Sequence, residues 1–300
     1  MIRGSTEKKV SDKKPTISFY AKEQIDCPVC RKFFRREEML SGGGRMIAGN
    51  LTDELRRIFE PSVKYGQVYP LIYSVGACPH CQTALFWNDF KTLSPADAEK
   101  ILDKKEDRLE SVKAIFPYYN LDHERTVFDG AAMYYMALLC YEEVSPSFSP
   151  TIKKAVISLR LAWLCGDLNK LLPGRNYDYI QQVFYRKALF FYQESLLYET
   201  GRKESITGLA NLGPDIDKNY GYDGVIYLCG LLEYKYGQRE DYAARLKKLD
   251  ESKRAIARIF GLGKSSKAKP GPLLEHSRSL YDALTKELKH DNQLDFDDDE

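Results

Sequence analysis

The residues of this sequence best suited to chemistry are two pairs of closely spaced cysteines. They are Cys27-Pro28-Val29-Cys30 and Cys78-Pro79-His80-Cys81. Each pair places two thiols on one tight turn, and together they supply four sulfurs, the tetrahedral donor set that Zn²⁺ prefers. A shell closed by four sulfurs leaves no coordination position open for water. We therefore predict that Cys27, Cys30, Cys78 and Cys81 bind a structural Zn²⁺ ion that takes no part in catalysis.

A redox function is the alternative interpretation of these cysteines, because CxxC pairs also serve thioredoxin-like chemistry. Two pairs are present, however, and neither has a βαβ pattern around it. His80 lies inside the second turn, but four thiolates suffice for the metal, and we expect its ring to point to solvent. The insertion between the pairs is long, which is tolerable because the cost of closing a loop rises only logarithmically with its length.

Extended segments flank both cysteine pairs, as they do in a zinc ribbon. Residues 16–20 read as a short strand before the first pair, while residues 68–75 and 83–87 are rich in β-branched and aromatic residues around the second. Within the insertion, Thr52 is a plausible N-cap for a short helix over residues 53–59, because its hydroxyl can accept a hydrogen bond from the first turn.

From Ser94 onward the apolar pattern is helical. Helices are expected at 94–116, 126–144, 150–172, 177–200, 222–236, 240–260 and 272–289. Glycines 201, 237 and 261 stand just past three helix ends, where the left-handed conformation suits glycine. Small and aromatic residues over 224–234 have the rhythm of a tetratricopeptide (TPR) hairpin, and residues 158–169 are a weaker copy. A generic helical bundle is the alternative.

The expected fold is therefore mainly α, with a small β-rich zinc-ribbon-like module at the N-terminus followed by a TPR-like helical repeat or bundle. The expected segments are a disordered basic N-terminus (1–17), the zinc module (18–92), the helical domain (94–262), a linker (263–271), a C-terminal helix (272–290) and an acidic tail (291–300).

Composition and motifs argue against an enzyme and against a membrane protein. No apolar run is long enough to span a bilayer and the N-terminus lacks a secretory signal, so we expect a cytoplasmic protein with reduced thiols. Cys140, Cys165 and Cys229 fall on apolar helical stretches and are expected in the core. No catalytic triad or zinc-protease motif is present. The segment 261–265 resembles the end of a P-loop, but Arg258 stands where the motif needs glycine.

The net charge of +2 hides a strong asymmetry along the chain. The last ten residues carry acids and no base, whereas residues 247–269 are basic. Solvated charge is the simplest interpretation. Autoinhibitory contact between the two segments and nucleic-acid binding by the basic one are the alternatives. The zinc module is itself rich in arginine. Candidate contacts for a protein partner or a nucleic acid are Arg31, Arg45, Arg56 and Arg57.

These motifs resemble a bacterial family catalogued as domain of unknown function 2225. The resemblance rests on both cysteine pairs, on the run from Pro70 to Cys81, on Asn88-Asp89-Phe90, and on residues 137–141 and 159–164. It covers roughly residues 18–250 and implies a zinc-ribbon-like module followed by TPR-like helices. It implies no activity. The acidic tail and the Gly-rich segment with the helix expected from Asp53 look specific to this lineage.

The leading hypothesis is a non-enzymatic, zinc-containing cytoplasmic scaffold or adaptor that binds a protein partner through its helical domain. A nucleic-acid-binding zinc-ribbon protein is the first alternative, since zinc ribbons often contact nucleic acid. A thiol or zinc redox sensor is the second. If the module has a function of its own, we expect it on the insertion around Arg45 and Arg56.

Overall fold

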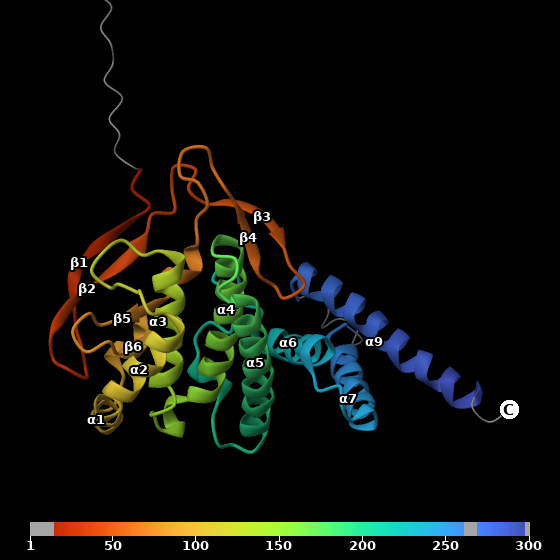
Figure 1. The fold of residues 1–300 in the computed structure, drawn as a ribbon. Helices are drawn as coiled ribbons and strands as arrows, with labels where there is room; N and C mark the ends of the chain where they lie inside the picture. Colours follow the sequence, from red (N-terminus) through yellow and green to blue (C-terminus); the bar gives the residue numbers. More distant parts are fainter. Residues whose placement is uncertain (1–14, 261–268, 298–300) are drawn as a thin grey trace, which may run out of the picture.

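Short β-hairpins at the N-terminal end lead into a long array of helices (Figure 1). The structure, a computed structural model, describes residues 15–260 and 269–297. Residues 1–14 of the expected N-terminal segment, the last two residues of the expected helical domain, most of the expected linker and the last three residues lie outside the described residues, and so does the P-loop-like segment 261–265. Among the residues that are described, no helix combines the length and apolarity needed to cross a membrane.

Two hairpins carry the cysteine pairs on their turns. Strands β1 (Ser18–Asp26) and β2 (Phe33–Met39) pair antiparallel around the first turn, and β5 (Val75–Ala77) pairs with β6 (Ala84–Phe86) around the second. The expectation of extended segments around each pair is therefore confirmed. The strand expected over 68–75 is wrong for its first part, which forms a buried 3-10 turn, η1 (Pro70–Tyr73), that begins with its proline.

The helix expected over residues 53–59 is also wrong, because the insertion forms a third hairpin. Its strands are β3 (Ile47–Leu51) and β4 (Arg57–Glu60). Thr52 does cap a turn, but it closes the hairpin loop: its hydroxyl accepts a hydrogen bond from the backbone N–H of Arg56 at 3.1 Å. Leu55 adopts φ +60 and is fully buried, so tertiary packing outweighs the local helical preference.

The helices follow the expected order. They are α1 (Pro95–Asp103), α2 (Lys105–Ile115), α3 (Val127–Cys140), α4 (Pro150–Leu171), α5 (Tyr177–Thr200), α6 (Gly221–Tyr236), α7 (Tyr242–Phe260) and α9 (Gly271–Asp297), with 3-10 turns η2 (Trp87–Lys91), η3 (Pro146–Phe148) and η4 (Ile206–Gly208). The helix expected over 94–116 is broken at Lys104. The last helix continues to Asp297, into the segment named as the acidic tail.

The expected capping signal at Ser94 operates at the start of a helix, but the expected glycine signals at two helix C-termini do not. Ser94 caps α1 by accepting from the N–H of Asp97, and Thr126 forms a capping box with Asp129 at the start of α3. The expected left-handed glycines are not observed at two helix ends: Gly201 has φ −80 and Gly237 has φ −59. Gly261 lies outside the described residues.

Consecutive helices pack side by side from α3 to α7, and α9 lies along α7 and α6 (Figure 1). One continuous cluster of buried apolar side chains runs from Cys27 to Leu284, so the cysteine hairpins and the helices share a core. At Gly130 of α3 a Cβ would lie 2.4 Å from the Ile72 side chain, which shows how closely η1 approaches this helix.

Candidate metal centre and the docked hairpin

The two cysteine turns meet, and their four sulfur atoms form one cluster. The Sγ atoms of Cys27, Cys30, Cys78 and Cys81 all lie within 4.8 Å of one another. The Cys27–Cys81 and Cys30–Cys78 sulfur pairs are separated by 3.6 and 3.7 Å. A tetrahedron with metal–sulfur distances of about 2.3 Å has edges of about 3.8 Å, so the spacing fits a four-sulfur metal site. These cysteines can hold a metal ion.

The two turns have the same backbone geometry. The N–H of Arg31 bonds to the carbonyl of Cys27 at 2.9 Å, and the N–H of Gln82 bonds to the carbonyl of Cys78 at 2.8 Å. Arg31 and Gln82, which follow the second cysteine of each pair, both adopt left-handed backbone conformations, with φ +60 and +58. This conformation is unfavourable for residues with a Cβ and persists where the surrounding structure imposes it.

In each pair the first cysteine sulfur accepts a hydrogen bond from a backbone N–H group. The N–H of Cys30 donates to Cys27 Sγ, and the N–H of Cys81 donates to Cys78 Sγ. Hydrogen bonds from the Cys27 and Cys78 thiols lower the pKa of Cys81, whereas hydrogen bonding with Cys78 and Cys81 raises the pKa of Cys27. Cysteine binds metal as the thiolate, so a metal cation bound here would displace the thiol protons.

The three other cysteines and His80 stay outside the cluster. Burial raises the pKa of Cys140, and it raises the pKa values of Cys165 and Cys229 to about 12. These thiols pack within or against the core, as expected from sequence. His80 is exposed, with Nε2 lying 3.3 Å from the Phe33 carbonyl oxygen.

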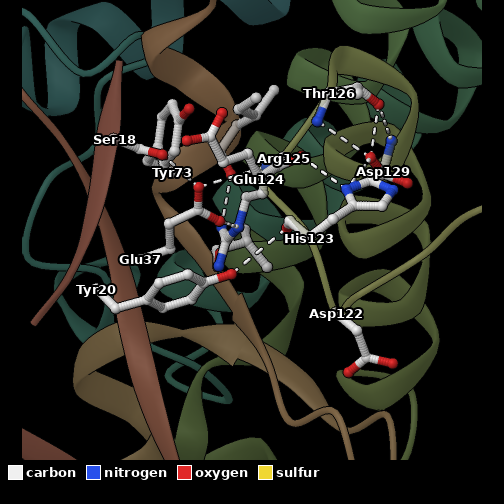
Figure 2. A network of polar contacts seen from close by, with 12 residues as sticks. Ser18, Tyr20, Glu37, Tyr73, Asp122, His123, Glu124, Arg125, Thr126 and Asp129 are labelled. Carbon is white, nitrogen blue, oxygen red and sulfur yellow. Dashed lines mark hydrogen bonds and ion pairs between the residues drawn. The ribbon is translucent and has the colours of Figure 1, made fainter. Parts of the chain in front are cut away.

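A buried ion pair joins the first cysteine hairpin to the helices. The Arg125 guanidinium, just before α3, lies 3.1 Å from Glu37 of β2, and Glu37 is only 2% exposed (Figure 2). Arg125 also donates to the carbonyls of Ile72 and Val75 at 2.9 and 2.8 Å. Glu37 in turn accepts from the Ser18 hydroxyl at 2.5 Å. One guanidinium therefore connects β2, η1 and β5 with the start of α3.

A second buried contact lies at Asp89, within the Asn88-Asp89-Phe90 motif. Asp89 accepts a hydrogen bond from Tyr141 at 2.5 Å and pairs with Lys153 of α4 at 2.9 Å. Burial lowers the pKa of Lys153, an effect that the carboxylate of Asp89 opposes. Tyr141 also accepts from the N–H of Phe86 at 2.9 Å. The motif therefore holds β6 and η2 against α3 and α4.

The loop of the third hairpin inserts an acidic residue among the helices. Glu54 is 7% exposed and accepts hydrogen bonds at Oε2 from Trp163 at 2.5 Å and from Tyr185 at 2.9 Å. Its Oε1 lies 3.2 Å from the ammonium of Lys235, which also pairs with Asp53 at 2.7 Å. Side chains from α4, α5 and α6 thus converge on one carboxylate.

Three of the four candidate arginines are engaged within the protein, two in ion pairs and one in hydrogen bonds to backbone carbonyls. Arg56 pairs with Asp167 of α4, and Arg57 pairs with Asp217 at 3.1 Å. Arg45 donates to the carbonyls of Thr16 and Gly42 at 3.1 and 2.7 Å. Arg31 is exposed, and within residues 15–260 and 269–297 no ion pair involves it. The four arginines therefore do not form one patch of free positive charge.

Sequence reasoning missed Glu37, Glu54 and Arg125, since their partners lie far away along the chain. The only local signal is the cluster of charges at residues 53–57, which breaks the apolar pattern of a strand without completing an amphipathic helix.

The family of uncharacterized proteins conserved in bacteria, domain of unknown function 2225, matches residues 20–284 of this chain. The chain belongs to this family. An uncharacterized protein of Borreliella burgdorferi (strain ATCC 35210) is 40% identical over 275 residues, which cover 91% of this chain and 98% of the relative. No solved structure matches the chain. The resemblance inferred from the cysteine pairs and the helical motifs is therefore confirmed, and the match reaches residue 284 instead of about 250.

Proposed function

We propose that this family member is a cytoplasmic scaffold or adaptor in which a structural Zn²⁺ ion organises the N-terminal hairpins and TPR-like helices bind a protein partner. The observation that carries the proposal is the docking of the hairpin loop on α4, α5 and α6. These helices already hold the tight β3–β4 loop through Trp163, Tyr185 and Lys235. The chemistry they use, aromatic donors and a cation around a carboxylate, is that of peptide recognition.

The cysteine cluster supports a structural task for the metal. The donor set is four sulfurs from two rigid turns, and three of the four cysteines are buried. Such a shell stabilises the fold and offers no open coordination position for a substrate. The metal would fix the two cysteine hairpins against each other, and Arg125 would transmit that arrangement to α3.

Capture from a native bacterial lysate, followed by reconstitution with purified components, tests the adaptor proposal. The full-length chain is expected to retain a protein in fixed stoichiometry, and the purified pair is expected to re-form that complex. Failure of every captured protein to bind again in purified form would overturn the proposal.

Nucleic-acid binding is the second candidate, favoured by three exposed cations near the first cysteine turn. They are Arg31, Lys32 and Arg35. Binding through them would weaken steeply with salt, because phosphate contacts release counterions. A gel-retardation series in increasing salt, repeated with Arg31→Glu, tests this candidate; no retardation at low salt removes it.

A further inference from the structure

A cavity of about 550 Å³ lies where α5 meets the junction between α6 and α7. Arg186 and Phe190 line it from α5, Arg239 lines it from the loop after α6, and Lys248 lines it from α7. We call this cavity the α5–α7 groove. It is distinct from the cysteine cluster, whose residues do not line it.

Positive charge dominates the accessible wall of the α5–α7 groove. Arg186, Arg239 and Lys248 are exposed, and in the part of the chain that the structure describes none of them has an ion-pair partner. Two acids also line the groove. Glu240 is exposed, whereas Glu233 is 1% exposed and accepts from Gln193 at 2.7 Å. The surface that a ligand meets therefore carries an excess of cations.

The buried carboxylate of Glu233 helps to shape the groove. A Cβ at Gly237 would lie 2.2 Å from Glu233 Oε1, so only glycine lets the chain pass over this carboxylate at the end of α6. The other oxygen binds the Gln193 amide of α5. Glu233 thus joins α5 to the α6–α7 junction on the groove floor.

The α5–α7 groove is continuous with the site that holds Glu54. Lys235 and Tyr236 line the groove, and the same two side chains contact Glu54 Oε1 at 3.2 and 3.4 Å. Tyr236 also stacks on Tyr185 at a centroid distance of 4.1 Å. The helices therefore bind acidic side chains of the hairpin loop at one end of a surface whose other end is open and cationic.

An apolar platform lies beside the free cations. The Phe190 side chain is 56% exposed, and the neighbouring Leu189 also lines the groove. An apolar anchor ringed by charges is the usual arrangement of an energetically important contact, while the charges set specificity and association rate. The docked loop has a matching pattern, because its two acids, Asp53 and Glu54, precede the buried Leu55.

We propose that the α5–α7 groove binds an extended acidic segment of a partner protein, with an apolar side chain on Phe190 and carboxylates at Arg186, Arg239 and Lys248. This inference rests on the proposed adaptor function and gives the chemistry of its partner. Excess positive charge, continuity with the Glu54 site and the exposed aromatic ring all favour the same occupant. A basic or purely apolar segment would leave the three cations uncompensated.

A labelled peptide supplies the probe. Its sequence is that of residues 291–300, which hold six acids, no base, one leucine and one phenylalanine. Fluorescence anisotropy with the full chain is expected to show saturable binding that weakens as salt screens the charges. Arg186→Glu and Lys248→Glu are each expected to weaken binding at least about tenfold. The matched control is Lys247→Glu, an exposed neighbour on α7 that does not line the groove.

Three outcomes would overturn the inference. The first is that the peptide shows no saturable binding at about 1 mM protein. The second is that a peptide with every acid replaced by its amide binds equally well. The third is that neither Arg186→Glu nor Lys248→Glu changes the affinity. Self-association of the wild-type chain that Arg186→Glu abolishes would place a second copy in the groove and reject a separate partner. A captured partner whose binding survives Arg186→Glu would leave the adaptor proposal standing and remove this one.

Discussion

The indole N–H of Trp163 donates a 2.5 Å hydrogen bond to the carboxylate of Glu54, although 109 positions separate the two residues. This contact fixes the hairpin loop between β3 and β4 on the helices. Because the same hairpin belongs to the insertion between the two cysteine pairs, the chain is anchored at the cysteine cluster before and after it and at the helices through its loop.

Replacing Glu54 by alanine is expected to lower the free energy of unfolding by about 3 kcal/mol, because it leaves the buried indole N–H of Trp163 and the buried hydroxyl of Tyr185 without their acceptor. Lys235 keeps its ion pair with Asp53 at 2.7 Å and adds little to this loss. Glu54→Gln keeps an acceptor and should cost less than half as much. Urea denaturation followed by circular dichroism measures both values. The control is Glu60→Ala, at an exposed position of β4. A loss below about 0.5 kcal/mol for Glu54→Ala would contradict a role for this carboxylate in stability.

The cysteine centre and most helix boundaries could be predicted because their signals are local. The paired CxxC spacing predicts which four cysteines cluster, and Ser94 with Pro95 marks the start of α1. The β3–β4 hairpin could not be predicted in this way. Leu55 and Glu54 acquire their conformation from burial against helices more than a hundred residues later, and no residue near them encodes that partner.

The sequence also does not reveal which of the candidate arginines have an acidic partner, because these partners lie far away along the chain. Arg56 and Arg57 read as free basic charge in a linear sequence, but Asp167 and Asp217 face them in the fold. The α5–α7 groove shows the opposite case. Its three exposed cations, Arg186, Arg239 and Lys248, lie far apart in the sequence and come together only where α5 meets the α6–α7 junction.

The purified protein is expected to contain one metal ion per chain, and removal of that ion is expected to lower the midpoint temperature of thermal unfolding. The four thiols must lose their protons to bind the metal as thiolates, so acidification should also release the ion. Metal analysis of the purified chain before and after dialysis against a chelator, with thermal unfolding of both samples, checks this expectation. Cys78→Ser should reproduce the effect, whereas Cys229→Ser, outside the cluster, should retain the metal. Equal metal content in both variants would contradict the assignment of ligands.

Acid should destabilise the protein partly through Asp97 at the start of α1. Burial alone would raise the pKa of Asp97, but hydrogen bonds from Ser94 and Ser145 outweigh it and lower the pKa from 3.8. A depressed carboxyl pKa contributes stability that is present above about pH 4 and is lost as the pH falls through the folded-state value. Unfolding free energies of Asp97→Asn should therefore depend less on pH below 4. Asp103→Asn, at an exposed position of the same helix, should behave like the wild type.

Arg125 is expected to control whether the first cysteine hairpin stays attached to the helices. Its guanidinium binds Glu37 and two backbone carbonyls at once, a geometry that the single ammonium of lysine cannot reproduce (Figure 2). Removing it also leaves the buried Glu37 without its cation, so Arg125→Ala should cost about 3–5 kcal/mol and Arg125→Lys somewhat less. Hydrogen exchange should then rise selectively in β1 and β2 while α4 and α5 stay protected. Arg35→Lys, on the exposed side of β2, provides the control. Uniform loss of protection throughout the chain would show that Arg125 stabilises the whole fold and does not specifically hold this hairpin.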